Sequence, residues 1–526
     1  MRVFIPTAGI GSRLGSLTKN LNKSLLTINN KPVISHIIDY YPANTEFVIA
    51  LGFDAKKIKN FLRVCYPKKK IYFVHVKKFC GPGSGLRHTL LQSKKKLQKP
   101  FIFHACDSLV KGLLPKLKNN WIGVSSLSKN KNYRTVGILN NKLLFNEKKS
   151  KKNNNFFTYI GVSGIFDYKL FWKYLKKEKK NIGEISGING IIENQKKIFL
   201  KKFIWHDTGN LKSLQKIKKK INKKNKLLNI LEKESEAIWF VKDKVIKYHE
   251  DEKFISNRVL RQKILKKYTP NIIDHNKHFY VYKKVKAEVL SKNINIKIFI
   301  KLLKFLNKFW FKNNYKYKIS IKKDAYQFYK NKTYARTKQF LSKNPKIDKI
   351  KYINSLEVKS IKSLLKKIDW NNLANAVPCN FHGDLHFENI LYKKNKQFLL
   401  IDWRQDFNRL LDCGDLYYDL AKIMHGLIVS HANVLKNKYV AQFSKKNSVK
   451  IKLIISKKYK KLIIFFINWL KNHNYDYDKV TIITALVFLN IAPLHTKDYS
   501  IYLFNLSKLL LSNKNFIKNY LQNETN

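Results

Sequence analysis

The sequence predicts an α/β protein in two parts: an N-terminal domain with a mostly parallel sheet, then a part with a small β-containing lobe and a large helical lobe. Three observations lead to this prediction. The first 220 residues alternate short β-rich apolar runs with helix-like stretches. "AIWFVKDKVIKYH" then gives two strand-like runs around Lys242 and Asp243, as in a hairpin. From about residue 295 the pattern is mainly helical.

The elements of the first part are four apolar strand-like runs, "RVFIPTA", "EFVIALG", "KIYFVHV" and "PFIFHAC", with helical stretches such as "KPVISHIIDYY" between them. Residues 212–233 are polar, Lys-rich and helix-compatible, without a strand or a Gly/Pro turn. We therefore predict a first domain over 1–222, a linker over 223–235 and a second domain over 236–526. Within the second domain the small lobe, which includes the strand "HFYVYKKV", spans about 236–290, and the helical lobe about 291–526.

The composition limits the class of protein. A chain of 526 residues with 44% hydrophobic residues is long enough for two or three domains and can bury real cores. The formal charge of +72 comes mostly from Lys spread evenly along the chain, together with abundant Asn and Ile. We interpret this as compositional drift in preference to a nucleic-acid surface, and we expect no nucleic-acid partner. The charge still attracts anionic substrates such as nucleotides.

The cysteines and the apolar runs indicate the compartment. Five cysteines without a C-x-x-C pair are typical of reduced thiols in the cytosol. No signal peptide is visible, and "LIIFFINWL" and "TIITALVFLNIAPL" are shorter than the ~20 residues of a membrane span. We expect a soluble, cytoplasmic protein, and the sequence gives no indication of its oligomeric state.

The segment "IPTAGIGSRLG" places Gly9, Gly11 and Gly15 directly after the first strand. Glycines there let backbone amides approach a phosphate closely. The segment lacks the third glycine and the later acid of a dinucleotide fingerprint, and it lacks the G-K-[ST] of a Walker A loop. On this loop alone, a phosphate-binding loop and an ordinary structural turn are equally compatible with the sequence.

Further residues over about 210 positions give the loop a context. With Arg13 in the loop and Lys23 in "NLNKSLLTINNKP", the chain resembles the G-x-G-[ST]-R-L…K signature of the sugar-phosphate and phosphocholine nucleotidyltransferases. "GPGSG", "FIFHACDS", "YIGVSGIF" and "WHDTGN" follow in matching order. The resemblance implies a Rossmann-like domain in which "GPGSG" contacts the base and "YIGVSGIF" lines the acceptor pocket. It implies nucleotide contacts at Ala8, Gly9, Gly11, Ser12, Gly81 and Gly85.

The same resemblance implies the chemistry. A phosphomonoester oxygen attacks the α-phosphate of an NTP and pyrophosphate leaves; because the nucleophile is already anionic, the enzyme must align and neutralise charge. Arg13 would hold the pyrophosphate, Lys23 would lie at the α-phosphate, and Asp107 and Asp207 would hold Mg²⁺. Alone, an Asp such as Asp107 after a strand is more often a helix cap. The presence of Asp207 in "WHDTGN" favours the metal role.

A second cluster, "NFHGDLHFENIL" over 380–391, allows three interpretations: a zinc pair, a phosphotransfer loop or a polar turn. His382 and His386 are four residues apart, but Gly383 stands where H-E-x-x-H has its Glu, and the context is loop-like. Asp384 and Asn389 have the spacing of a kinase catalytic loop. Asp402 follows at the end of a strand-like run, where a second metal ligand is expected, so we favour phosphotransfer.

The set H-G-D-x-x-x-x-N…I-D-W resembles the choline kinase and aminoglycoside phosphotransferase superfamily, which has a bilobal α+β protein-kinase-like fold. The resemblance implies Asp384 as the catalytic carboxylate, Asn389 and Asp402 as Mg²⁺ ligands, and Asp419 in "GDLYYDLAK" as a structural residue that orients the loop. Lys247 is the candidate for the strand lysine on the ATP phosphates.

The match has gaps. No Gly-rich loop precedes Lys247, and the helix after it offers no Glu partner. Arg404 stands where many relatives carry an acid. A non-catalytic kinase-like module therefore remains an alternative.

Together the two resemblances predict a bifunctional enzyme that phosphorylates a small hydroxyl compound with ATP and transfers NMP from an NTP to a phosphomonoester. Such nucleotide-activated units supply capsule, lipopolysaccharide or lipid headgroup synthesis. A sugar or polyol is slightly favoured as the hydroxyl compound, and a CTP:phosphocholine-type enzyme with choline kinase is the alternative. A nucleotidyltransferase with a non-catalytic module and a basic nucleic-acid-associated protein also remain open.

Overall fold

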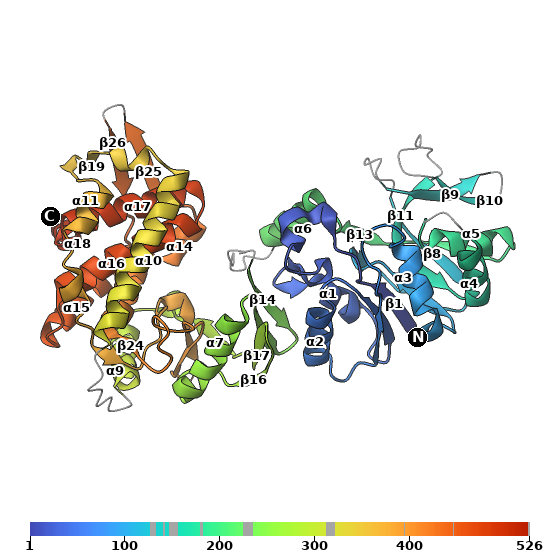
Figure 1. Ribbon diagram of the computed structural model, residues 1–526, viewed down its shortest axis with the longest axis horizontal. Helices are drawn as coiled ribbons and strands as arrows, with labels where there is room; N and C mark the ends of the chain where they lie inside the picture. Colours follow the sequence, from blue (N-terminus) through green and yellow to red (C-terminus); the bar gives the residue numbers. More distant parts are fainter. Residues whose placement is uncertain are drawn as a thin grey trace. The chain divides into compact units, whose positions relative to one another are not determined.

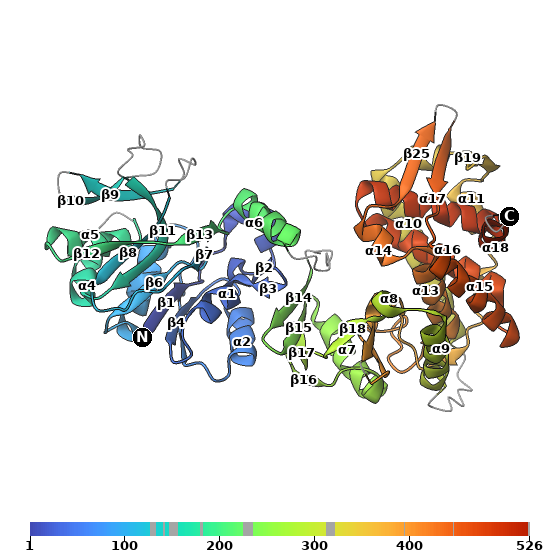
Figure 2. The same ribbon diagram turned by 180° about the vertical axis from the view of Figure 1, so that it is seen from behind.

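The computed structural model describes residues 1–126, 133–139, 142–146, 156–178, 182–224, 235–311, 321–393, 395–444 and 447–523. The chain folds into two compact units: Met1–Asp251 with Asp274–Lys284, and Glu252–Ile273 with Val285–Asn526 (Figures 1 and 2). This division differs from the predicted boundary after residue 222, because the hairpin that follows belongs to the first unit. Most of the predicted linker 223–235 lies outside the described residues, and the domain boundaries stay a prediction.

Within the described residues, nine strands form the main sheet of the first unit. At its centre β1 (Arg2–Pro6) lies between β4 (Glu46–Leu51) and β6 (Phe101–His104) and is parallel to both. β5 (Ile71–His75) continues the parallel part beside β4. The predicted parallel sheet is therefore confirmed for these four strands.

The rest of this sheet is mixed. β11 (Phe156–Ile165) runs antiparallel to β6. It also pairs antiparallel with β9 and β8, β10 pairs with β9, and β12 lies parallel to β8. The bounds are β8 (Asn120–Ser125), β9 (Thr135–Leu139), β10 (Lys142–Asn146) and β12 (Ile198–Lys202).

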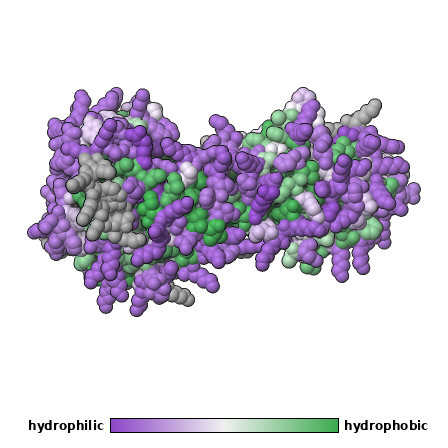
Figure 3. Space-filling model, turned by 60° about the horizontal axis from the view of Figure 1, so that its bottom comes forward, coloured by the Kyte–Doolittle hydropathy of each residue, from purple (hydrophilic) through white to green (hydrophobic). Residues whose placement is uncertain are grey.

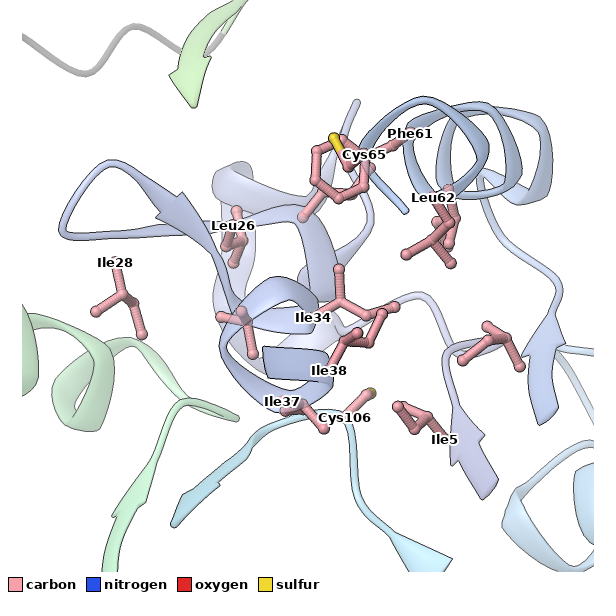
Figure 4. Packing of buried hydrophobic residues seen from close by; sticks show 14 of the residues in the cluster. Ile5, Leu26, Ile28, Ile34, Ile37, Ile38, Phe61, Leu62, Cys65 and Cys106 are labelled. Carbon is pink, nitrogen blue, oxygen red and sulfur yellow. The ribbon is translucent and has the colours of Figure 1, made fainter. Parts of the chain in front are cut away.

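Helices cover both faces of the parallel strands, and the strand sequences show why. Along β1, Val3 and Ile5 enter one core while Phe4 enters the other, because successive side chains of a strand point to opposite faces. The first core includes residues of α1 and α2, among them Ile38, which lies near Ile5, and Phe61, which lies beside Cys65 (Figure 4). The helix bounds are α1 (Val33–Tyr40), α2 (Ala55–Cys65), α3 (Leu86–Ser93), α4 (Tyr168–Lys177), α5 (Ile185–Glu193) and α6 (Leu211–Lys224).

The predicted hairpin forms as β14 (Glu236–Val241) and β15 (Lys244–His249), and it packs into the first core. The sheet order is β14, β15, β17 (Phe279–Lys283) and β16 (Ile272–His275). Trp239 is fully buried, with its ring 5.2 Å from that of Phe61 and 5.6 Å from that of Tyr248. The apolar face of this small sheet therefore shares the core of α2.

The second unit is mainly helical after residue 295. Its central helices are α9 (Ile296–Trp310), α10 (Lys322–Lys343), α13 (Leu416–Ile428), α16 (Tyr477–Ile491) and α17 (Lys497–Ser512). A three-stranded sheet of β18 (Ala287–Val289), β22 (Ile390–Lys393) and β23 (Phe398–Leu400) carries the loop of the second candidate site.

The other elements are shorter or peripheral. They are β2 (Thr27–Ile28), β3 (Lys31–Pro32), β7 (Ser108–Lys111), β13 (Ile204–Asp207), α7 (Glu252–Leu265), α8 (Leu290–Asn293), β19 (Tyr352–Ile353), β20 (Leu356–Glu357), α11 (Ile361–Lys366), α12 (Trp370–Leu373), β21 (Pro378–Cys379), β24 (Gly414–Asp415), α14 (His431–Leu435), β25 (Val440–Ser444), β26 (Ser448–Lys452), α15 (Lys457–Asn472) and α18 (Phe516–Asn523).

Among the described residues, one helical stretch, Tyr477–Leu494, is long and apolar enough to cross a membrane by length and composition. It is longer than the run that the sequence indicated, and 67% of it is buried inside the protein, where α16 packs against α13 and α17. Buried core helices meet the same criterion. Hydrophilic side chains cover much of the face in Figure 3, in keeping with the abundance of Lys.

Candidate functional site

The first candidate site lies at the carboxyl ends of β1 and β6. These strands are adjacent and parallel, so the loops that follow them leave the same edge of the sheet. The glycine loop follows β1, and Asp107 is the third residue after β6. In the sheet, β1 has β4 on one side and β6 on the other, so the strand order changes direction at β1. Ligands of open α/β sheets bind at the carboxyl ends of the strands at such a topological switch point.

Lys23 and Asp107 meet at this edge. The Lys23 ammonium lies 2.8 Å from Oδ2 of Asp107. Burial lowers the pKa of Lys23, but the Asp107 carboxylate outweighs burial and raises it above its usual value. Burial likewise raises the pKa of Asp107, and Lys23 with the more distant charge of Arg13 brings it below its usual value. Both groups are therefore charged near neutral pH.

Asp207 reaches the same point through strand pairing. β13 runs antiparallel to β7, with Asp207 opposite Ser108. The backbone amide and the hydroxyl of Thr208 both donate to the Asp107 carbonyl, at 2.8 and 2.9 Å. A Cβ on Gly209 would lie 2.8 Å from Oδ2 of Asp107 and 3.1 Å from Oδ1 of Asp207. The two carboxylates therefore face one small space that the missing side chain of Gly209 leaves open.

The donor set at this space suits Mg²⁺. Magnesium is usually held by one or two carboxylates, with substrate phosphates and water completing its shell. In the described parts of the chain no group of three or more His, Cys, Asp or Glu residues could hold a metal ion by itself, as a structural zinc site would require. Tyr133 and Asn210 donate to Oδ2 of Asp207 at 2.7 and 2.6 Å and fix its orientation.

The glycine loop packs directly on this site. Gly11 has a left-handed φ of 73°, and a Cβ there would lie 3.3 Å from Cβ of Lys23. Gly52, at the end of β4, would bring a Cβ within 2.6 Å of the Ala8 carbonyl and 2.8 Å of the Phe79 Cβ. The end of β4 at Gly52 therefore packs closely against Ala8, at the start of the glycine loop, and against Phe79, just before "GPGSG".

The remaining predicted nucleotide contacts lie in two turns. Ser12 and Arg13 begin a short 3-10 helix, Ser12–Thr18, and both are exposed. Gly9 has open space where a Cβ would stand. Gly81 has a φ of 75°, and Gly85, with a φ of 134°, precedes the first residue of α3. The space beside Gly9 and Gly81 is free of other atoms, so a nucleotide could approach the backbone there closely.

A buried pair of side chains near this site, Tyr159 and Glu184, is not marked by any motif in the sequence. Tyr159 of β11 donates a hydrogen bond of 2.9 Å to Oε1 of Glu184, and both side chains are buried. Burial raises the pKa of Glu184, and the charge of Asp107 raises it further. Glu184 follows the left-handed Gly183 in "NIGEISG", which matches no motif, so a buried acid there was not foreseeable from spacing.

The second candidate site lies in the loop before β22. Oδ1 of Asp384 lies 2.7 Å from the ammonium of Lys422 on α13, and Oδ2 accepts a 3.0 Å hydrogen bond from Asn389. The Asp384 side chain is 40% exposed while that of Lys422 is only 7% exposed, so the carboxylate is open to a substrate. Burial raises the pKa of Asp384, but Lys422 and His386 outweigh it and hold that pKa well below its usual range.

Buried polar groups hold this loop in place. Asp419 accepts hydrogen bonds from the backbone amides of His382 and Gly383, at 2.9 and 2.7 Å, and from Trp310. Arg261 of α7 is fully buried and donates to three backbone carbonyls, those of Leu411, Arg404 and Phe381. The sequence indicated an orienting role for Asp419, whereas Arg261 had no motif to mark it.

Asn389 and Asp402 are brought together by backbone contacts. The Ile401 amide donates to the Asn389 carbonyl over 2.8 Å, so Asp402 follows directly beside the loop. Asp402 has a left-handed φ of 58°, a conformation that occurs more often at functional sites. Its Oδ1 lies 3.8 Å from Arg258. The imidazole of His382 contacts the Ile401 carbonyl at 3.0 Å, which is a scaffolding contact.

Lys247 lies on β15, opposite Ile238 of β14 and Tyr280 of β17, and is buried. It belongs to the first compact unit, whereas Asp384, Asn389 and Asp402 belong to the second. Its role as the strand lysine of a kinase stays a prediction.

Several known proteins resemble the N-terminal part of the chain in sequence. No protein-family model matches the chain. The bifunctional protein GlmU of Methanococcus vannielii is 25% identical over 223 residues, which are 40% of this chain and 52% of that protein. D-glycero-alpha-D-manno-heptose 1-phosphate guanylyltransferase of Campylobacter jejuni is 28% identical over 189 residues, 34% of this chain and 84% of that protein. The chain thus spans about half the length of the GlmU relative.

Among solved structures, CTP:phosphocholine cytidylyltransferase from Streptococcus pneumoniae is 16% identical and covers 42% of this chain and 98% of its own, with a TM-score of 0.35. A UDP-glucose pyrophosphorylase bound to UDP-glucose is also 16% identical and covers 43% of this chain and 99% of its own, with a TM-score of 0.36. The sequence relatives place the N-terminal part of the chain, about 40% of its length, among homologues of nucleotidyltransferases.

Proposed function

We propose that the first unit is a nucleotidyltransferase that joins an NMP to a phosphomonoester. The observation that carries the proposal is the convergence of Asp107 and Asp207 on the space above Gly209, with the Lys23 ammonium 2.8 Å from Asp107. Sequence relatives support it, because two of them are named for guanylyl and cytidylyl transfer to sugar 1-phosphates. We therefore favour a sugar 1-phosphate as the acceptor.

In this proposal the residues bind and align charge. Lys23 releases Asp107 and moves to the α-phosphate, where its ammonium stabilises the negative charge that builds up during attack. Arg13, exposed in the glycine loop, binds the pyrophosphate that leaves. Asp107 and Asp207 would hold Mg²⁺, which neutralises phosphate charge when bound.

We propose further that the second unit is a small-molecule kinase. The geometry of Asp384 supports this function: an ionised, solvent-facing carboxylate is fixed by Lys422 and Asn389. Asp384 would accept the hydrogen bond of the substrate hydroxyl and align it on the γ-phosphate of ATP, and Asn389 and Asp402 would hold Mg²⁺. A kinase makes the kind of phosphomonoester that a nucleotidyltransferase uses, so the fusion fits two successive steps toward a nucleotide-activated surface-polysaccharide or lipid unit.

The test is mass spectrometry of the purified full chain with Mg²⁺, ATP and a panel of hydroxyl compounds, and then with each NTP and a panel of phosphomonoesters. We expect Asp384→Asn to abolish phosphorylation and to spare nucleotidyl transfer, and Asp207→Ala to do the reverse. Full nucleotidyl transfer in Asp207→Ala would refute the metal assignment. No phosphorylation by the unmodified chain would leave the second unit as a non-catalytic binding module.

A further inference from the structure

Four basic side chains of the second unit lie near one another, because the charges of Arg336, Arg404 and Lys422 all act on Lys332, as does that of Asp384. Lys332 and Arg336 come from α10, Arg404 from the segment after β23, and Lys422 from α13. Lys422 is paired with Asp384. The other three form no ion pair with a described residue, because no carboxylate oxygen of the described residues lies within 4.0 Å of their side-chain nitrogens.

Two of these unpaired cations rest on the same aromatic ring. The Lys332 ammonium lies 4.8 Å from the centre of the Phe328 ring, and the Arg404 guanidinium lies 4.9 Å from it. Lys332 also lies 3.4 Å from the Tyr418 hydroxyl. The Phe328 ring is fixed in turn by Phe407, at 4.4 Å between ring centres. The cations are therefore held by packing, as in a built site, and do not extend freely into solvent.

The loop itself brings Arg404 to the reaction centre. The Arg404 amide donates to the His382 carbonyl over 2.8 Å. A Cβ on Gly383 would lie 2.6 Å from Cβ of Arg404, so only glycine allows this approach. Arg404 thus packs against the residue that precedes Asp384. In the sequence, Arg404 stands out only as a departure from the kinase pattern.

Like charges held this close are unfavourable without a counter-ion. Burial, and then the charges of Arg404, Lys422 and Arg336, lower the pKa of Lys332 well below its usual value, and Asp384 offsets only part of this. An anionic group bound between Lys332 and Arg404 would remove the repulsion, and charge-assisted hydrogen bonds from both would hold it. A quaternary ammonium such as choline would add to the repulsion.

We propose that the hydroxyl compound accepted by the second unit already carries an anionic group, a phosphate monoester or a carboxylate, which Lys332 and Arg404 bind. This proposal rests on the proposed kinase function and names its substrate class. The substrate hydroxyl oxygen attacks the γ-phosphorus of ATP, the bond from that phosphorus to the β–γ bridging oxygen breaks, ADP leaves, and the hydroxyl proton passes by way of Asp384 to solvent. The product carries two anionic groups.

The experiment compares matched acceptors with the full-length chain and MgATP: glycerol, glycerate and glycerol 3-phosphate; glucose, gluconate and glucose 6-phosphate; and choline. ADP release and product mass are measured for the unmodified chain, Lys332→Met, Arg404→Gln and the control Lys338→Met. Lys338 lies on the same helix and is exposed, so its replacement removes the same charge away from the site. Far-UV circular dichroism and melting curves check that each variant folds.

We expect phosphorylation of anionic acceptors, with the phosphate and carboxylate series showing which anion is used. Lys332→Met and Arg404→Gln should raise the KM for that acceptor about tenfold or more and leave the KM for ATP within about twofold, as expected for a lost charged hydrogen bond. Lys338→Met should match the unmodified chain. Phosphorylation confined to neutral acceptors or choline would overturn the proposal, as would an equal rise in the KM for ATP, because the cations would then serve the nucleotide.

A binding arm separates this proposal from the kinase function itself. Inorganic phosphate, used as the probe, is titrated calorimetrically into the same four proteins. Loss of one phosphate-binding event in Lys332→Met and Arg404→Gln, but not in Lys338→Met, supports the anion site. If this loss is seen and no acceptor is phosphorylated, the anion site stands and only the kinase function is refuted. Identical isotherms in all four proteins would overturn the anion site.

Discussion

Trp239 of β14 donates a hydrogen bond of 3.1 Å from its indole nitrogen to the hydroxyl of Thr27, 212 residues earlier in the chain. The Phe240 amide next to it donates to the Asn30 carbonyl over 2.7 Å. The small sheet that the sequence assigned to a separate lobe is thus tied by side chain and backbone to the turn of β2 and β3. We infer that this sheet and the rest of the first unit unfold together.

Replacing Trp239 should test this coupling. Trp239→Ala removes a fully buried indole and leaves a cavity, so we expect the first unit to lose about 3–5 kcal/mol of unfolding free energy. Chemical denaturation, followed by the loss of nucleotidyl transfer, measures it. Phe199→Ala is the control, because Phe199 in the same unit is 44% exposed. An unchanged midpoint in Trp239→Ala would show that the sheet does not stabilise this unit.

Lys23 should matter for the rate of nucleotidyl transfer. Lys23→Met keeps the length of the side chain and removes the charge beside Asp107, so we expect kcat to fall by about 10²–10³ with a small change in KM for the NTP. The exposed Lys19, four residues earlier, gives the matched control Lys19→Met. Steady-state pyrophosphate release measures both. If the two variants have equal rates, Lys23 is only a structural partner of Asp107.

Asp419 should act on the second site alone. The backbone amides of His382 and Gly383 donate to different oxygens of Asp419, so in Asp419→Asn the amide nitrogen would face one of these two amides and leave it without an acceptor. We expect phosphorylation to fall by about 10² or more as the loop loses its orientation, while nucleotidyl transfer stays unchanged.

The same assay on Asp498→Asn, an exposed site on α17 of the same unit, controls for the loss of one negative charge. Normal phosphorylation in a folded Asp419→Asn protein would contradict the orienting role.

His386 should make the stability of the second unit depend on pH. Burial lowers the pKa of His386, but Asp384 and Glu388 outweigh burial and raise it from 6.5 to about 9. Because the pKa is higher in the folded protein, the stabilisation is fully present below pH 6.5 and is lost as the pH rises through about 9. We expect a loss on the order of 1–3 kcal/mol over this window.

Denaturation of the unmodified chain and of His386→Gln at pH 6, 7.5 and 9.5 measures the effect, with these pH values chosen to span roughly the titration window. The difference between the two proteins should shrink as the pH rises. A constant difference would mean that the imidazole contributes by packing and not by its charge.

Much of the first site could be read from the sequence, because its residues lie within short motifs attached to strand ends. The order of Gly11, Lys23, Asp107 and Asp207 along the chain indicated one site, and β1 and β6 do bring the loops of Gly11 and Asp107 to one sheet edge. Glu184 could not be found in this way, because its importance comes from burial beside Tyr159 and from the charge of Asp107.

The sequence by itself determined the alternation of strands and helices, the parallel centre of the first sheet, the helical character after residue 295 and the local spacing of Asp384 and Asn389. These follow from side-chain periodicity and from motifs a few residues long, which are local properties. Only the tertiary structure decided that β14 and β15 share the core of α2, that Lys422 pairs with Asp384, and that the charges of Arg404 and Lys422 act on Lys332. Such contacts join residues far apart in the chain, and their free energy depends on burial and on charges that no local pattern records.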